Sequence, residues 1–146
     1  MTQRPIKFRV WNDKAKKMDF VGGVVWDKGQ IVEVDVDDGP EVIDPILMQY
    51  TGLTDKNGTE IYDGDYLNVV AQPVVTGKNL SDFQKENPYK IYWCLTQAGF
   101  ALWSLKSTSS LPIPMYGVAG YIDAETYTVE VIGNIYENPV LLKEAV

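Results

Sequence analysis

The chain has 146 residues, of which 45% are apolar and 23% charged, and it contains no histidine. This length and composition suit a single folded domain with a real core and exclude a disordered or fibrous protein. The missing histidine removes the usual general base of serine and cysteine hydrolases, and a net charge of −7 disfavours nucleic-acid binding as the main activity.

Residues 1–20 predict a β-hairpin with one apolar and one charged face. Apolar side chains recur at every second position of its first strand, at Ile6, Phe8 and Val10. Lys7 and Arg9 fall on the opposite face, where we expect water to solvate them. After a turn, Met18 and Phe20 are expected to return on the inner face.

A second hairpin is predicted around Trp26-Asp27-Lys28-Gly29. It leads into a strand whose inward positions are Val32, Val34 and Val36. Glu33 and Asp35 alternate with these valines and are expected to face water. Asp38-Gly39-Pro40 ends the strand, because proline cannot donate a hydrogen bond to a neighbouring strand. We expect residues 1–45 to form an N-terminal hairpin lobe.

The stretch from Leu47 to Leu67 carries the densest turn signals of the chain. Asp55-Lys56-Asn57-Gly58 has Asp at the first and Gly at the fourth position, which is typical of a type I turn that closes a hairpin. Gly58 is expected to adopt the left-handed conformation that side chains disfavour. A second signal, Asp63-Gly64, precedes an apolar strand over 66–71. The stretch predicts strand, hairpin, short strand, turn and strand.

The remainder of the chain predicts an irregular insertion followed by further strands. The insertion covers about residues 72–90, with one short helical turn at 81–86. Strands are expected over 91–95, 100–105 and 127–136. Gly99 suits a bulged hairpin between the first two of them, and residues 107–114 form a loop by composition. Short strands with hairpin turns predict a mainly β, antiparallel fold rather than a parallel sheet with helices.

Segments spread along almost the whole chain resemble the YopX family of phage and prophage proteins. They are a K-F-R-x-W opening at 7–11, LMQYTGL at 47–53, D-x-N-G at 55–58, I-Y-x-G-D at 61–65 and G-N-I-Y-E-N-P-x-L-L at 133–142. The resemblance implies a single YopX-like domain over 1–146, with an SH3-like small barrel at 46–146 beside the hairpin lobe. It also implies a phage-encoded accessory protein without an established molecular activity. The family therefore provides no catalytic residues for this chain.

The acidic turns do not complete a metal-binding motif. The segments 35–39 and 55–58 lack the glycine and glutamate positions of a calcium loop. A magnesium site has no local sequence signature and stays a hypothesis, with Asp44, Asp63 and Asp65 as its candidate ligands.

Cys94 is the only cysteine, so the chain cannot form an internal disulfide. We expect its side chain to be a small hydrophobic group in a strand. We assign no catalytic, cofactor-binding or metal-binding residue.

Charge is unevenly distributed and bears on the choice of partner. Residues 1–20 carry a net +4, residues 21–65 a net −9 and the remainder a net −2. A basic patch is one interpretation of the first segment, formed by Arg4, Lys7, Arg9, Lys14, Lys16 and Lys17. A solvated hairpin face is the interpretation we favour.

Three classes of function remain open. The first is a non-enzymatic protein-binding or adaptor module that engages a protein through a strand edge or an aromatic-lined groove. The second is a metal-dependent hydrolase built on the acidic residues, and the third is a nucleic-acid-related role through the basic hairpin or through acidic mimicry of DNA. We expect a cytoplasmic protein with no membrane span and with a protein partner. Unpaired strand edges make a homo-oligomer a further hypothesis.

Overall fold

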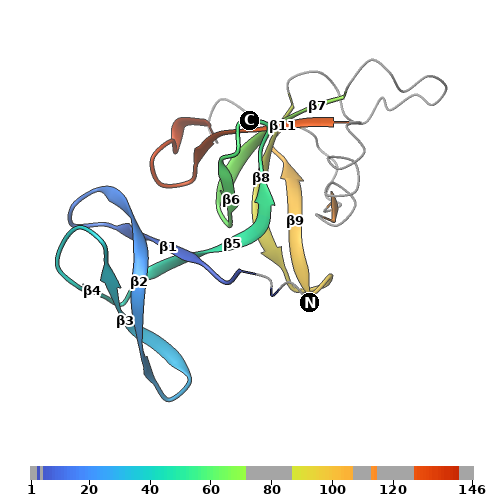
Figure 1. Cartoon of the computed structure of the whole chain (residues 1–146). Coiled ribbons are helices and arrows are strands. Elements are labelled where there is room, and N and C mark those ends of the chain that lie inside the picture. The colour runs from blue at the N-terminus through green and yellow to red at the C-terminus, as the bar shows by residue number, and fades with distance from the viewer. Residues whose placement is uncertain (1–2, 4, 72–86, 107–112, 115–126, 142–146) are drawn as a thin grey trace.

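The computed structural model describes residues 3, 5–71, 87–106, 113–114 and 127–141 (Figure 1). These residues are mainly β and form two antiparallel sheets, which confirms the predicted fold class. The first sheet has the strand order β4-β3-β2-β1-β5-β6, and the second has the order β10-β9-β8-β7-β11. Both orders are linear, and neither sheet closes on itself among the described strands. The SH3-like barrel therefore stays a prediction.

The first sheet is built from the N-terminal hairpins and the turn-rich stretch. Its strands are β1 Phe8–Asn12, β2 Lys17–Asp27, β3 Gln30–Val36, β4 Val42–Ile43, β5 Ile46–Thr54 and β6 Glu60–Tyr62. The predicted turn between β2 and β3 is present, with positive φ angles of 50° at Lys28 and 84° at Gly29. Because β5 pairs with β1, this sheet crosses the expected boundary between residues 45 and 46. Figure 1 shows the β2–β3 hairpin extending away from the second sheet.

The second sheet contains the later strands. Its strands are β7 Asp65–Ala71, β8 Asn87–Cys94, β9 Gly99–Ser104, β10 Ile113–Pro114 and β11 Tyr127–Asn134. Strand β8 begins earlier than expected and takes up the end of the predicted insertion, and β10 pairs with β9 inside the predicted loop. Between β8 and β9, Ala98 rather than Gly99 has the positive φ angle, 47°. The predicted helical turn at 81–86 lies outside the described residues, as do the rest of the insertion and residues 107–112.

Two apolar clusters form the core. The larger one packs β6 against the second sheet and contains Ile61, Leu67, Val69, Tyr89, Ile91, Phe100, Leu102, Tyr127 and Val129. The smaller one lies on the first sheet and contains Trp11, Met48, Tyr50 and Tyr62, with Met18 and Tyr136 packed against it. Because β6 contributes to both clusters, it ties the two sheets together.

The expected division of β1 into an apolar and a solvated face is wrong. Arg9 is buried with 9% exposure, whereas Ile6, before the strand begins, is 71% exposed. Phe20, expected on the inner face of β2, is 58% exposed. The physical reason is that other residues cover both faces of β1, an inner strand between β2 and β5, and that Tyr62 and Asp65 lie against the face of Arg9. Val10 is fully buried on one face, and Arg9 lies with Trp11 on the other.

Candidate functional site

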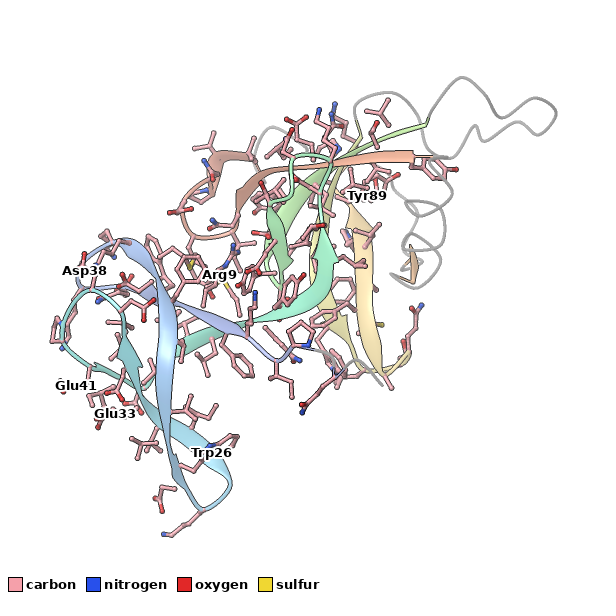
Figure 2. The ribbon with its side chains drawn as sticks, in the orientation of Figure 1. Arg9, Trp26, Glu33, Asp38, Glu41 and Tyr89 are labelled. Carbon is pink, nitrogen blue, oxygen red and sulfur yellow. The ribbon has the colours of Figure 1, made fainter. Side chains whose placement is uncertain are left out.

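A buried ion pair joins the first sheet to the start of the second. The Arg9 guanidinium donates to Asp65 Oδ1 at 2.5 Å, and the two side chains are 11% and 1% exposed. Asp65 Oδ2 accepts the backbone N–H of Tyr62 at 2.8 Å, and the Arg9 guanidinium lies 4.7 Å from the centre of the Tyr62 ring. Burial raises the pKa of Asp65, although the charge of Arg9 acts against this shift. Figure 2 shows Arg9 between the two sheets.

A second cation from the same end of the chain pairs with β6. Lys7 forms an ion pair with Glu60, and its ammonium lies 5.3 Å from the centre of the Tyr50 ring. The other Glu60 oxygen accepts the Tyr62 hydroxyl at 2.7 Å. The hydrogen bond from Lys7 lowers the pKa of Glu60, while burial and the bond to Glu60 raise the pKa of Tyr62. Lys7 and Arg9, which were expected to face water, are therefore matched with carboxylates from residues 60–65.

The predicted type I turn is confirmed, and its aspartate also reaches the second sheet. Asp55 Oδ1 accepts the backbone N–H groups of Asn57 at 2.8 Å and Thr59 at 2.9 Å. Gly58 has a φ angle of 81°, as the turn requires. Asp55 Oδ2 accepts the backbone N–H of Val131 at 3.0 Å, across to β11. Burial opposes ionisation of Asp55, but these hydrogen bonds outweigh it and lower its pKa.

The C-terminal segment packs against the same region. Gly64 in the second predicted turn has a φ angle of 85°, and its carbonyl accepts the Ile135 N–H at 3.0 Å. The rings of Trp11 and Tyr136 are stacked with centres 5.6 Å apart. Asn134 holds the end of β11, because its Oδ1 accepts the backbone N–H groups of Tyr136 and Glu137. These segments and the two ion pairs form one contiguous junction between the sheets.

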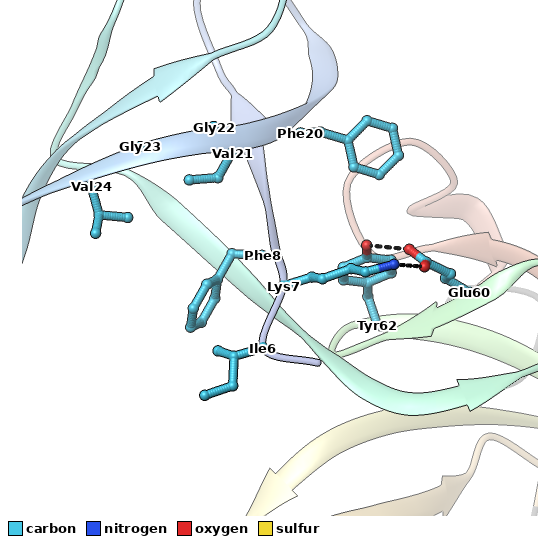
Figure 3. A pocket seen from close by; sticks show the side chains of 10 residues that line it. All are labelled: Ile6, Lys7, Phe8, Phe20, Val21, Gly22, Gly23, Val24, Glu60 and Tyr62. Carbon is cyan, nitrogen blue, oxygen red and sulfur yellow. Dashed lines mark hydrogen bonds and ion pairs between the residues drawn. The ribbon is translucent and has the colours of Figure 1, made fainter. Parts of the chain in front are cut away.

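A groove opens beside this junction, between β1 and β2. The two strands pair as far as Arg9 and Phe20, and beyond that point they part. The resulting hollow has a volume of about 430 Å³ (Figure 3). Its walls are largely apolar and come from Ile6, Phe8, Phe20, Val21 and Val24. Lys7, Glu60 and Tyr62 close one end with polar groups.

Among the strands that the structure describes, none pairs with the edge of β2 that borders the groove. From Val21 to Asp27, β2 pairs with β3 on one side only, and no other described strand pairs with its second edge. A register shift between Val21 and Gly23 marks a bulge where β2 leaves β1. Bulges bend a strand, and glycines allow a neighbouring backbone to approach closely. The adjacent glycines 22 and 23 were the sequence signal for this site, and our sequence-based prediction missed it.

Comparisons with known proteins identify the family. A family model described as YopX protein matches residues 7–143. The chain belongs to the YopX family. Among solved structures, protein EF1440 from Enterococcus faecalis is similar, with 25% sequence identity and a TM-score of 0.63. The similarity covers 96% of this chain and 99% of that chain. A search of curated proteins finds no significant match.

In this YopX-family chain, the segments that carry the family resemblance meet at the junction between the sheets. The opening segment supplies Arg9 and Trp11, the turn-rich stretch supplies Asp65, and the C-terminal segment supplies Tyr136. Their side chains bind one another through the ion pair and the ring stacking. The shared segments therefore act as scaffold, and the groove beside them is our candidate functional site.

The residues named for a magnesium site do not come together as ligands. Both oxygens of Asp65 already accept hydrogen bonds, from Arg9 and from Tyr62. Asp44 lies between β4 and β5, and burial raises the pKa of Asp63, which favours its neutral form. Among the described residues, no three acidic or cysteine side chains are grouped so that they could hold a metal ion.

Other predicted features have local structural explanations. Within the described part of the chain, most cations of the predicted basic patch are paired with carboxylates, namely Lys7, Arg9, Lys16 and Lys17. Cys94 is buried at the end of β8, where its sulfur lies 3.2 Å from the hydroxyl of Thr96. No helix in the described ranges is long and apolar enough to cross a membrane.

Proposed function

We propose that this YopX-family protein is a non-enzymatic protein-binding module whose partner occupies the groove between β1 and β2. The observation that carries the proposal is the coincidence of an apolar groove with an unpartnered strand edge. Exposed strand edges promote association with other chains, and stable β proteins normally shield them. Exposed apolar side chains beside such an edge add a hydrophobic contribution to binding.

The exposed apolar residues of the N-terminal strands support this assignment. Phe20, Val24, Val25 and Trp26 are between 37% and 61% exposed along β2. Large exposed aromatic side chains are enriched where proteins bind one another. Figure 2 shows Trp26 toward the far end of the β2–β3 hairpin. A partner that enters the groove would cover Phe20 and Val24, which line it.

Family membership extends the proposal to the biological setting. The YopX resemblance supports an accessory protein encoded by a phage or prophage and acting in the cytoplasm of the bacterial host. In that setting the partner would be a host or phage protein.

A capture experiment with matched variants tests the proposal. Wild-type protein, the groove variant Phe20→Asp and the control Leu95→Asp would each serve as bait in a lysate of lysogenic cells. Leu95 is 86% exposed and follows β8, so its variant introduces the same chemical change away from the groove. We expect a specific protein to be captured by the wild type and by Leu95→Asp but lost with Phe20→Asp. If Phe20→Asp captures the same protein as the wild type does, or if no bait captures a specific protein, the proposal is contradicted.

A further inference from the structure

The unpartnered edge of β2 has the properties of a strand-addition site. Its residues from Val21 to Asp27 include neither lysine nor proline, the residues that commonly guard exposed edges. The groove separates this edge from residues 6–8, so an incoming segment has free space along it. An extended peptide that binds a sheet edge gains main-chain hydrogen bonds, while alternate side chains fill pockets.

Carboxylates lie close to the glycines of this edge. If a Cβ atom stood on Gly23, Asp35 Oδ2 would lie 2.6 Å from it, and Asp37 Oδ1 would lie 3.3 Å from one on Gly22. Asp35 and Asp37 are exposed, and neither forms an ion pair within the described part of the chain. The two carboxylates therefore extend from β3 over the glycines of β2. A lysine or arginine on an added strand has to span only about one strand spacing, or roughly 5 Å, to reach them.

We propose that the groove takes an extended, basic peptide segment that adds to β2 as a strand and places Lys or Arg against Asp35 and Asp37. The proposal rests on the protein-binding function above and specifies the chemistry of the partner. A second copy of this chain fits less well, because each copy would bring the same carboxylates to the shared edge and like charges repel. The apolar wall at Phe8, Val21 and Val24 would take the alternate, apolar side chains of the segment.

The probe is a synthetic peptide of about nine residues in which Val and Lys alternate, long enough to form a strand. We expect it to shift the amide NMR signals of Val21 to Asp27 and to slow their hydrogen exchange. A peptide in which Val and Glu alternate should bind at least about tenfold more weakly, because its charge is reversed. Equal binding of the two peptides would overturn the basic character of the segment.

N-methylation separates strand addition from simple apolar docking. One peptide series carries N-methyl groups on its odd residues and the other on its even residues. In a strand, the backbone N–H groups point alternately to the two sides. Either the odd or the even residues of the peptide therefore point their N–H groups at β2, whether the added strand runs parallel or antiparallel to it. We therefore expect one series to bind like the unmodified peptide and the other to lose binding. If both series bind equally, or if neither binds, the segment does not add as a strand.

Charge-matched variants test the two carboxylates. Asp35→Asn/Asp37→Asn should weaken binding of the Lys peptide by roughly tenfold. The control Glu41→Gln/Asp44→Asn removes the same net charge from the same lobe and should change binding less than about twofold. Asn at position 44 suits the backbone there, whose φ angle is 50°. Equal weakening in both double variants would mean that overall charge, not these carboxylates, attracts the peptide.

The outcomes distinguish this inference from the proposed function. If the captured partner is lost with Phe20→Asp but no peptide binds, strand addition of a basic segment is overturned and the binding function stands. If neither experiment gives groove-dependent binding, both proposals fall. If light scattering shows dimers that Phe20→Asp abolishes, the occupant is a second copy and the basic-peptide inference is wrong.

Discussion

Replacing Arg9 with methionine tests the ion pair that joins the two sheets. The variant keeps the length of the side chain but removes the guanidinium that donates to Asp65 Oδ1. Asp65 would stay buried, with its side chain 1% exposed, and would keep only the backbone N–H of Tyr62 as a donor. An uncompensated buried charge is strongly destabilising, because the interior solvates it poorly.

The expected loss of unfolding free energy is about 3 kcal/mol at pH 7, near the low end of the range for breaking a buried pair. The low end applies because the Nε atom of Arg9 is buried without a hydrogen-bond partner in the described structure, and the substitution removes that cost. For a chain of this size, such a loss lowers Tm by roughly 10 °C.

The pH dependence gives a second check on Arg9→Met. Burial already raises the pKa of Asp65, and loss of the neighbouring cation would raise it further. The folded variant therefore binds a proton more tightly than the unfolded chain, so its stability falls as pH rises from about 4 toward the raised pKa. The stability deficit relative to wild type should be larger at pH 7 than at pH 4, because it shrinks as Asp65 takes up its proton.

Two further variants test whether the lost stability comes from the uncompensated charge of buried Asp65. Arg9→Met/Asp65→Asn removes both charges and keeps an oxygen for the Tyr62 N–H, so we expect it to recover most of the loss. Lys7→Met breaks the more exposed pair with Glu60, where water screens the charges, and should have a much smaller effect. Thermal and urea unfolding would measure all three variants. If Arg9→Met lost no more stability than Lys7→Met at pH 7, or if its deficit did not change with pH, the Arg9–Asp65 pair would not be the stabilising link between the sheets.

The remaining predictions concern the turns. Asp55→Ala should lower the unfolding free energy by about 2 kcal/mol at pH 7. The lowered pKa of Asp55 means that wild type loses this stabilisation as pH falls below the ordinary carboxyl value, which urea titrations from pH 7 to 2 would show. Gly58→Ala should cost about 1 kcal/mol, because its φ angle is 81° but no atom lies within 4 Å of the added methyl. Gly64→Ala should cost more in the same assay, since Ile135 lies 3.3 Å from that methyl position. Asn134→Ala should cost about 1 to 2 kcal/mol and increase hydrogen exchange at Tyr136.

The turns could be predicted from sequence because their causes are local. Asp55 binds N–H groups two and four residues away, and Gly58 and Gly64 adopt positive φ angles within their own turns. Alternation likewise predicted the buried Val34 and the exposed Asp35 of β3. In the turns the interaction that fixes the conformation lies within a few residues, so a short window of sequence contains it.

Arg9 and the groove could not be predicted, because distant segments create them. The partner of Arg9 lies 56 positions later in the chain, and no local pattern links the two residues. The alternation of apolar and polar residues indicates a strand with one solvent-exposed face, whereas β1 is covered on both faces. The groove depends on where β1 and β2 stop pairing, which Gly22 and Gly23 hint at but do not determine.

The second oxygen of Asp55 has a consequence for how the chain matures. The turn uses Oδ1 locally, but Oδ2 binds the N–H of Val131, 76 positions later, and the Lys56 N–H donates to the Val129 carbonyl. During synthesis the turn can form early, yet these bonds must wait until β11 has left the ribosome. A nascent or truncated chain that ends before residue 127 would lack β11 and would leave one edge of β7 unpaired, because β8 alone would then flank Leu67 and Val69. Completion of the second sheet is therefore coupled to synthesis of β11, Tyr127–Asn134.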